Sequence, residues 1–282
     1  MSGTIGGSSA ASLYLQVAKN EPAEVKQFAG YDAATKTTVA WFQKQAPTLT
    51  TPAALLKDYR SLQVVLTAFN MSADISDTAV LKQLMTQDPT SATSLAKRSG
   101  NPSFQLFAKQ MSTWTPPPLS NPASVAAIVN QYATANYETS QGQQDPGMKE
   151  ALYFRRMIGS VKSINQLMAD PVLTKVAVGG AGLPQQFGLL DYSQQVPILT
   201  KAIDLTKFSK PGYVDQFVEQ YLFQSQAAAS GSASSTGILS LLGGSGATSG
   251  TDLLSTLFSG SSSSSSGQGV GGLLGALYST TA

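Results

Sequence analysis

Apolar residues recur at helical spacing through most of the first 225 residues, whereas the alternating pattern of strands is almost absent. The strongest pattern follows Thr51-Pro52, a pair typical of a helix N-cap and the first helical residue. Its members are spaced alternately by four and three residues: Leu55, Tyr59, Leu62, Leu66 and Phe69. This spacing places all of them on one helix face. We therefore predict an all-α fold in which the stripe packs against other helices.

A related stretch is present twice, as LLKDYRSLQVVLTAFNM (Leu55–Met71) and LMADPVLTKVAVGGAGL (Leu167–Leu183). A constant offset aligns Leu55 with Leu167, Asp58 with Asp170, Val64 with Val176 and Asn70 with Gly182. Asn and Gly readily adopt the left-handed conformation that follows a helix C-terminus. Each copy is therefore predicted to be one helix with the same kind of ending, and the fold to be two tandem helical modules that arose by internal duplication.

Prolines and shifts in composition divide the chain into five predicted segments. These are a flexible N-terminal segment (1–9), helical module 1 (10–113), a Pro-rich linker (114–120), helical module 2 (121–225) and a Ser/Gly/Ala-rich tail (226–282). In module 1, a first helix over Ala10–Lys19 is expected to end at Asn20, and Pro22 to start the next helix. Trp114 and the three prolines after Thr115 are interpreted as the link between modules, with docking to an aromatic groove as the alternative.

The tail contains no Lys or Arg, a single acid (Asp252) and three apolar islands: Ile238–Leu242, Leu253–Phe258 and Leu273–Tyr278. Low-complexity composition of this kind is typical of a flexible chain. The alternative is that the islands are short helical segments that dock onto a partner or onto one another.

Composition excludes several classes of site. The chain has no Cys and no His, so it lacks the usual zinc ligands, a thiol nucleophile and the base of a Ser-His-Asp triad. Its net charge is only +2, with dispersed Lys and Arg, which gives no basis for nucleic-acid binding. No run of about 18 apolar residues predicts a membrane-spanning helix, and the N-terminus lacks the features of a cleaved signal peptide. We expect no enzymatic activity, no cofactor and no metal.

Three motifs with chemical potential favour structural interpretations. The glycines of Gly179–Gly182 follow a helical pattern and do not match the phosphate-binding GxGxxG loop. Asp58 and Asp170 could form a carboxylate pair, but Asp170 before Pro171 is better interpreted as an N-cap, and Asp58 as a solvated mid-helix residue. The pair Arg155-Arg156 could bind an anion, although such a pair at a helix end is typically solvated.

The two copies resemble the repeated unit of a bacterial family known only as domain-of-unknown-function family 1217. That unit is a Leu-rich helix with an Asp near its start and an ending similar to ALKAFGL. Asp58 with Val65–Met71 resembles it closely, and Asp170 with Val178–Leu183 more loosely, because the second copy departs at Pro171 and Gly179-Gly180. The unit's later Asp-Pro stop and Asn-Pro-x-aromatic helix start are matched by Asp88-Pro89 and Asn101-Pro102-Ser103-Phe104. The resemblance covers about residues 10–225.

This resemblance implies an α-helical protein of alphaproteobacteria, often encoded among flagellar genes and without assigned catalytic residues. We therefore expect a non-enzymatic structural or interaction protein of the flagellum, exported there, with other flagellar proteins as partners and with self-association. A lack of Cys and an abundance of Ser, Thr, Gln, Asn, Ala and Gly are also typical of exported flagellar proteins. The candidate packing or interaction residues are Leu55, Tyr59, Leu62, Leu66, Phe69 and Trp114. The alternatives are a cytoplasmic chaperone or regulator of flagellar assembly that binds a client helix through the stripe, and an enzyme that uses carboxylates alone.

Overall fold

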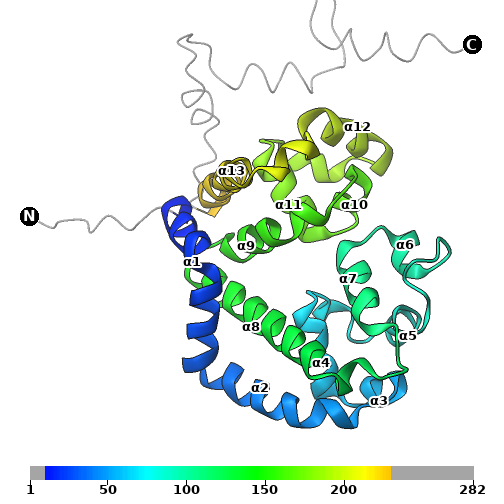
Figure 1. The fold of residues 1–282 in the computed structure, drawn as a ribbon. Coiled ribbons are helices and arrows are strands. Elements are labelled where there is room, and N and C mark those ends of the chain that lie inside the picture. The colour runs from blue at the N-terminus through cyan, green and yellow to red at the C-terminus, as the bar shows by residue number, and fades with distance from the viewer. Residues whose placement is uncertain (1–9, 230–282) are drawn as a thin grey trace, which may run out of the picture. The chain divides into compact units, whose positions relative to one another are not determined.

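The computed structural model describes residues 10–229, which form thirteen α-helices and six short 3-10 helices without a strand (Figure 1). The predicted all-α fold is confirmed. The α-helices are α1 (Ala10–Tyr31), α2 (Ala33–Gln45), α3 (Pro52–Lys57), α4 (Tyr59–Ala68), α5 (Thr78–Thr86), α6 (Leu95–Ser99), α7 (Pro102–Met111), α8 (Pro122–Gln144), α9 (Met148–Met157), α10 (Ile164–Met168), α11 (Pro171–Gly180), α12 (Tyr192–Ala202) and α13 (Pro211–Ala229). The 3-10 helices are η1 (Ala46–Thr48), η2 (Ser72–Asp74), η3 (Pro118–Ser120), η4 (Ile158–Ser160), η5 (Gln185–Leu189) and η6 (Leu205–Ser209).

Two predicted segments lie largely outside the described residues. Residues 1–9 and 230–282, with the three apolar islands, are not described. Residues 226–229, which the sequence assigned to the tail, instead form the last turn of α13.

Short polar side chains start many of the helices, as the sequence predicts. Thr51 and Ser163 each accept a hydrogen bond from the backbone N–H three residues ahead, at 3.1 and 3.2 Å. Asn101 and Asp170 each precede a proline and accept from two backbone N–H groups of the helix they cap. These bonds satisfy N–H groups that have no partner within the helix, so each one fixes where a helix begins.

The predicted helix over Leu55–Met71 is wrong in one respect, because Asp58 divides it into α3 and α4. Asp58 leaves the helical conformation, with φ −91° and ψ 87°, and its carboxylate accepts the Ser61 N–H at 3.0 Å. The side chain of Gln45 donates to the same carboxylate at 3.1 Å. Asp58 is therefore an N-cap like Asp170, and the expectation of a solvated mid-helix residue is also wrong.

This break changes the predicted stripe. Leu55, Leu62, Leu66 and Phe69 are buried, whereas Tyr59 is 63% exposed. Tyr59 is the first residue of α4. Because the helix is interrupted at Asp58, the spacing of four residues from Leu55 does not place Tyr59 on the same face as Leu55. Four members of the stripe are therefore packed in the first core, and Tyr59 is not.

The predicted end of the first helix near Asn20 is also wrong, because α1 continues through Pro22 to Tyr31. Pro22 is exposed and removes one backbone donor. On the buried face of the same helix lie Val17, Val25 and Phe28. Packing along this face favours a continuous helix and outweighs the local cost of the proline.

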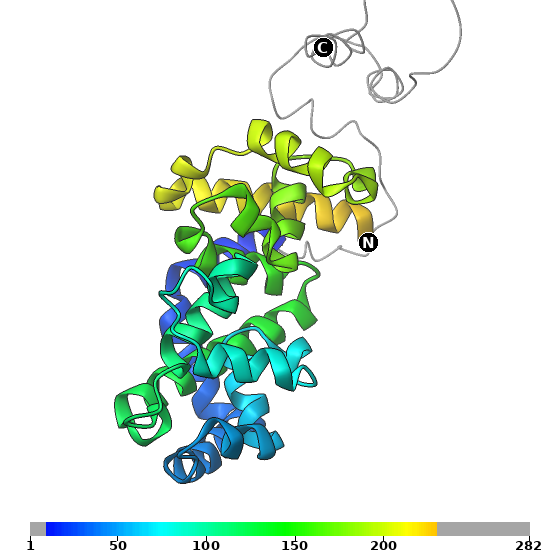
Figure 2. The same cartoon turned by 90° about the vertical axis from the view of Figure 1, so that its right-hand side faces the viewer.

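Buried apolar residues form two clusters, here called the first core and the second core. The first core is built from residues 42–128, and the second core from α1 and residues 133–222. They cut across the predicted division into modules 10–113 and 121–225, because α1 packs on α8, α9 and α13. Helix α8 contributes to both cores and runs diagonally between them (Figure 1). In Figure 2, α13 and its neighbours lie at one end of the described residues, and α2 and α3 lie at the other.

The two copies nevertheless have matching local structures. Helices α4 and α11 begin at residues 59 and 171, which are equivalent positions of the two copies. Asn70 and Gly182 are both left-handed, with φ of 58° and 68°. The N–H of the next residue then bonds a carbonyl five residues back, Met71 to Leu66 at 2.8 Å and Leu183 to Val178 at 3.0 Å. The predicted common ending is confirmed, whereas the duplication itself stays a prediction.

Replacing Leu62 by Ala should destabilise the protein by about 2–5 kcal/mol, because the side chain is 2% exposed within the first core. Tyr59→Ala, three residues earlier in the same helix, should change stability by about 0.5 kcal/mol or less, because Tyr59 is exposed. Chemical denaturation of both variants measures the difference. Equal losses of stability in the two variants would contradict this packing.

A buried polar hub on helix α9 as the candidate functional site

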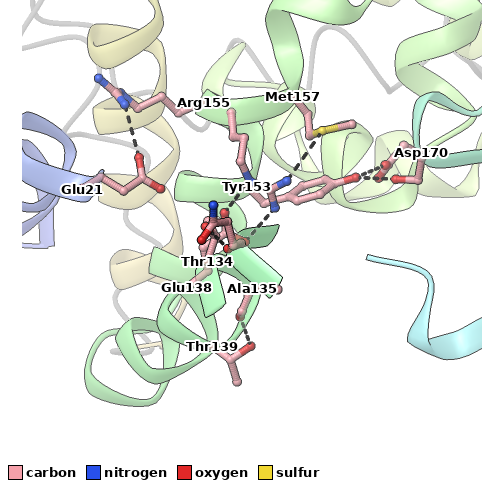
Figure 3. A network of polar contacts seen from close by, with 12 residues as sticks. Glu21, Thr134, Ala135, Glu138, Thr139, Tyr153, Arg155, Met157 and Asp170 are labelled. Atoms are coloured by element: carbon pink, nitrogen blue, oxygen red, sulfur yellow. Dashed lines mark hydrogen bonds and ion pairs between the residues drawn. The ribbon is translucent and has the colours of Figure 1, made fainter. Parts of the chain in front are cut away.

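Helix α9 places three polar side chains among the best-buried residues of the second core. Its apolar residues Ala151, Leu152 and Phe154 are fully buried. Between and after them come Tyr153, Arg155 and Arg156, each of which bonds to partners on other elements. Figure 3 shows Tyr153 directed toward Asp170 and Arg155 toward Glu21. These three residues and their partners are called the α9 hub.

Arg156 pairs with Glu138 of α8. The guanidinium Nε and Nη2 donate to the two carboxylate oxygens at 2.8 and 3.1 Å, a bidentate arrangement. The Glu138 side chain is only 2% exposed, and the guanidinium lies 5.2 Å from the centre of the Tyr153 ring. A carboxylate this deeply buried requires a counter-charge, so the pair fixes α8 against α9.

Arg155 connects α9 to α1 and α13. It donates to Glu21 of α1 at 3.3 Å and to Asp215 of α13 at 3.2 Å. The same oxygen of Asp215 accepts the hydroxyl of Tyr14 at 2.8 Å, which ties α1 to α13 a second time. One guanidinium therefore holds two helices that are far apart in sequence.

Tyr153 connects the two halves of the chain. Its hydroxyl donates to Asp170 at 2.6 Å and lies 2.9 Å from the hydroxyl of Ser103, at the start of α7. Next to Ser103, the amide of Asn101 donates to the Ala169 carbonyl at 3.0 Å. The N-caps of α7 and α11 thus meet at a buried seam of hydrogen bonds.

Burial changes the acid–base properties of the hub. It raises the pKa of the Glu21 carboxyl, and the nearby Glu138 carboxylate raises it further against the opposing effect of Arg155. Burial also raises the pKa of Glu138, although Arg156 opposes this. The pKa of Tyr153 is raised by burial and by the Asp170 carboxylate. Groups with shifted pKa values occur at active sites and also in structural networks of ion pairs.

The geometry favours structural use of these groups. Tyr153, Arg155 and Arg156 each bond to partners on other helices, so their donors are engaged within the fold. Neither of two surface hollows, of about 460 and 520 Å³, is lined by Tyr153, Arg155 or Arg156. The first lies beside Leu106 and Gln131, and the second extends from Lys97 and Tyr192 to Ala169 at the seam. Within residues 10–229, no three potential metal-ligating side chains gather at one point. In the same range, no helix combines the length and apolar character needed to cross a membrane.

The structure corrects the expectation for Arg155-Arg156 and supports the structural interpretation of the glycines. The arginine pair is not a solvated face, because both side chains are paired with carboxylates. The side chains of Arg155 and Arg156 are only 31 and 28% exposed. Gly179 and Gly180 lie within α11. A Cβ at Gly180 would lie 2.3 Å from the Phe217 ring, so these glycines permit the close approach of α11 and α13.

Trp114 and the residues after it are part of the first core. The Trp114 ring packs against that core, and Pro118 and Leu119 are buried. Its indole N–H is buried without a hydrogen-bond partner in the described part of the chain. The predicted linker 114–120 therefore also serves as packing for the first core.

Sequence reasoning missed the acidic members of the hub. Glu21 and Glu138 lie 134 and 18 residues from the arginines they pair with. In the sequence, only their positions mark these glutamates as unusual. Each lies on the buried face of a helix beside apolar residues such as Val25 and Tyr137. No spacing rule pairs charges across such separations, so the fold was needed to find them.

Comparison with known proteins identifies a family and a related fold. A family model described as "Protein of unknown function (DUF1217)" matches residues 68–214. The crystal structure of a structural-genomics target protein from Agrobacterium tumefaciens is similar, with a TM-score of 0.67 and 16% sequence identity. The similarity covers 80% of this chain and 98% of that one. No curated protein matches this chain.

Replacing Arg156 by Met should destabilise the protein by about 3–5 kcal/mol at pH 7, because the buried Glu138 carboxylate loses its counter-charge. The double variant Arg156→Met with Glu138→Leu should recover most of that loss, since it removes both charges. Urea denaturation of the two variants measures these changes.

Lys175→Met is the matched control, because the Lys175–Glu150 pair is more exposed, with 58% of the lysine side chain accessible. It should cost about 1 kcal/mol or less. Similar losses for Arg156→Met and Lys175→Met would contradict a special role for the buried pair.

Glu21→Gln should reduce the dependence of stability on pH. Because the pKa of Glu21 is raised in the folded state, the folded protein holds this proton more tightly than the unfolded chain. Its contribution to stability is thus complete below the ordinary pKa of 4.5 and is lost as pH rises through the folded pKa.

The free energy of unfolding should therefore fall less steeply above pH 4.5 in Glu21→Gln than in the natural protein. The control is Glu24→Gln, which changes an exposed glutamate of the same helix. If Glu21→Gln and Glu24→Gln give the same pH profile as the natural protein, burial of Glu21 does not couple folding to protonation.

Proposed function

The chain belongs to the DUF1217 family of proteins of unknown function, and from that premise we propose that it is a non-enzymatic structural or interaction protein of the bacterial flagellum. The proposal assigns its helical surfaces to contacts with other flagellar proteins. It assigns no catalytic residue, and it places the protein among the components that are exported to the flagellum.

The main support for a structural role is the α9 hub. Tyr153 is buried, Arg155 and Arg156 follow fully buried Phe154 in the same helix, and their bonds hold α1, α7, α8, α11 and α13 together. Groups engaged in this way stabilise an arrangement of helices. A catalytic group would instead need access to a substrate.

Support for the flagellum comes from family resemblance and composition. The resemblance of this chain to the family implies a gene that lies among flagellar genes, as genes of this family often do. This is an argument by association. The chain also has no Cys and only 12% charged residues, a composition typical of exported flagellar components. Neither observation depends on the geometry of the hub.

The alternative is a cytoplasmic chaperone or regulator of flagellar assembly that binds a client helix. The stripe on α4 is unsuited to a client, because Leu62, Leu66 and Phe69 are buried in the first core. A client surface would instead involve exposed apolar residues such as Leu189 and Tyr192, which are 86 and 56% exposed. The exposure of Leu189 and Tyr192 is the observation that favours this alternative.

Fractionation of the native protein tests the proposal in wild-type cells and in cells that lack flagellar export. We expect the protein outside the inner membrane in the wild type and its retention inside the export-deficient cells. A soluble cytoplasmic protein in both strains, absent from purified flagella, would contradict the proposal. Co-purification with one soluble client in that case would favour the chaperone.

A further inference from the structure

Each core is completed by a helix from the other half of the chain. Helix α8 is the first helix of the predicted module 2, yet its residues Val125 and Ile128 belong to the first core. Helix α1 is the first described helix of the predicted module 1, yet all of its buried apolar residues belong to the second core. The two first helices are thus exchanged between the halves of one chain.

The two crossings differ in how they are connected. Helix α8 crosses as one continuous helix, with Ala133 and Tyr137 already in the second core. In contrast, α1 is joined to α2 by Asp32 alone, at φ −69° and ψ 110°. The Asp32 carboxylate caps α2 by accepting the Thr35 N–H at 2.7 Å. A change of backbone conformation at this one residue would therefore release α1 from its own chain.

We propose that the α1 site on α9 and α13 is also a contact between copies of this protein, in which α1 of one chain occupies the site on a second chain. The occupant is another copy because the site is already complementary to α1 in shape and charge. Arg155 pairs with Glu21, and Asp215 accepts the Tyr14 hydroxyl. The proposal does not depend on assignment to the flagellum.

A chain that has released α1 must cover its second core again. Release of α1 uncovers the parts of α9 and α13 on which α1 packs, and it removes the Tyr14 hydroxyl from Asp215. It also leaves Arg155 without its Glu21 partner. Reciprocal exchange closes into a dimer, whereas exchange in one direction extends into a chain of copies.

Charge reversal gives a direct test, because one contact can be broken within a chain and restored between chains. Glu21→Arg places two cations together, and Arg155→Glu places three anions together. When both variants are present, the arginine introduced into the first can pair with the glutamate introduced into the second. The second variant's own Glu21 can likewise pair with the first variant's own Arg155.

The two full-length variants are refolded separately and together, and their masses are measured by native mass spectrometry.

We expect the joint refolding to give a mixed dimer, at least about tenfold more abundant than either variant's own dimer. The double variant Glu21→Arg with Arg155→Glu restores the pair within one chain and should behave like the natural protein. Single-chain masses in the joint refolding, with both variants folded, would overturn the proposal.

A second pair of substitutions tests the hinge without changing the docking site. Gly30→Ala with Asp32→Ala removes the α2 cap and raises helix propensity, which favours one continuous helix over α1 and α2. Gly30 is exposed, and an added Cβ would meet nothing within 4 Å. The dissociation constant of the dimer should fall at least about tenfold.

The control for the hinge is Gly212→Ala, another glycine at which a Cβ meets nothing within 4 Å. It should leave the dissociation constant unchanged. A folded hinge variant that remains a single chain at the highest soluble concentration would overturn the proposal, even if the charge-reversed variants fail to fold.

Discussion

The burial of Glu138 constrains how the helices of this protein can be arranged. A carboxylate that is 2% exposed needs a partner of opposite charge in a fixed position, and Arg156 supplies it through two hydrogen bonds. Because Arg156 lies on α9, that helix must face α8. Arg155 and Tyr153 then extend from the same helix to α1, α13 and the seam with α7. The apolar cores supply most of the favourable burial, and the hub selects one arrangement of the helices that surround it.

Much of the local structure could be predicted from the sequence because it depends on neighbouring residues. N-caps at Thr51, Asn101 and Asp170 and the left-handed endings at Asn70 and Gly182 have short-range causes. The break at Asp58 was missed because an apolar period continues across it. The passage of α1 through Pro22 and the charge pairs of α9 depend on contacts between distant segments, which no local pattern reports.

The arrangement of the cores has consequences for the candidate functions. A protein of two independent modules could be divided at residues 114–120, whereas here α1 belongs to the second core and the linker packs on the first. Residues 10–229 therefore form one compact unit. Such a unit suits a component that must keep its shape in an assembly. The fold shared with the Agrobacterium tumefaciens protein adds no functional assignment at 16% identity.

Amide hydrogen exchange of the full chain is the most direct test of the central position of α9. If the hub holds the surrounding helices together, the amides of Leu152–Arg156 should exchange only through global unfolding. Helix α1, held by Glu21 and Tyr14 and joined through Asp32, should open at a lower free energy. Exchange of the α9 amides as fast as those of α1, or faster, would contradict this account of the structure.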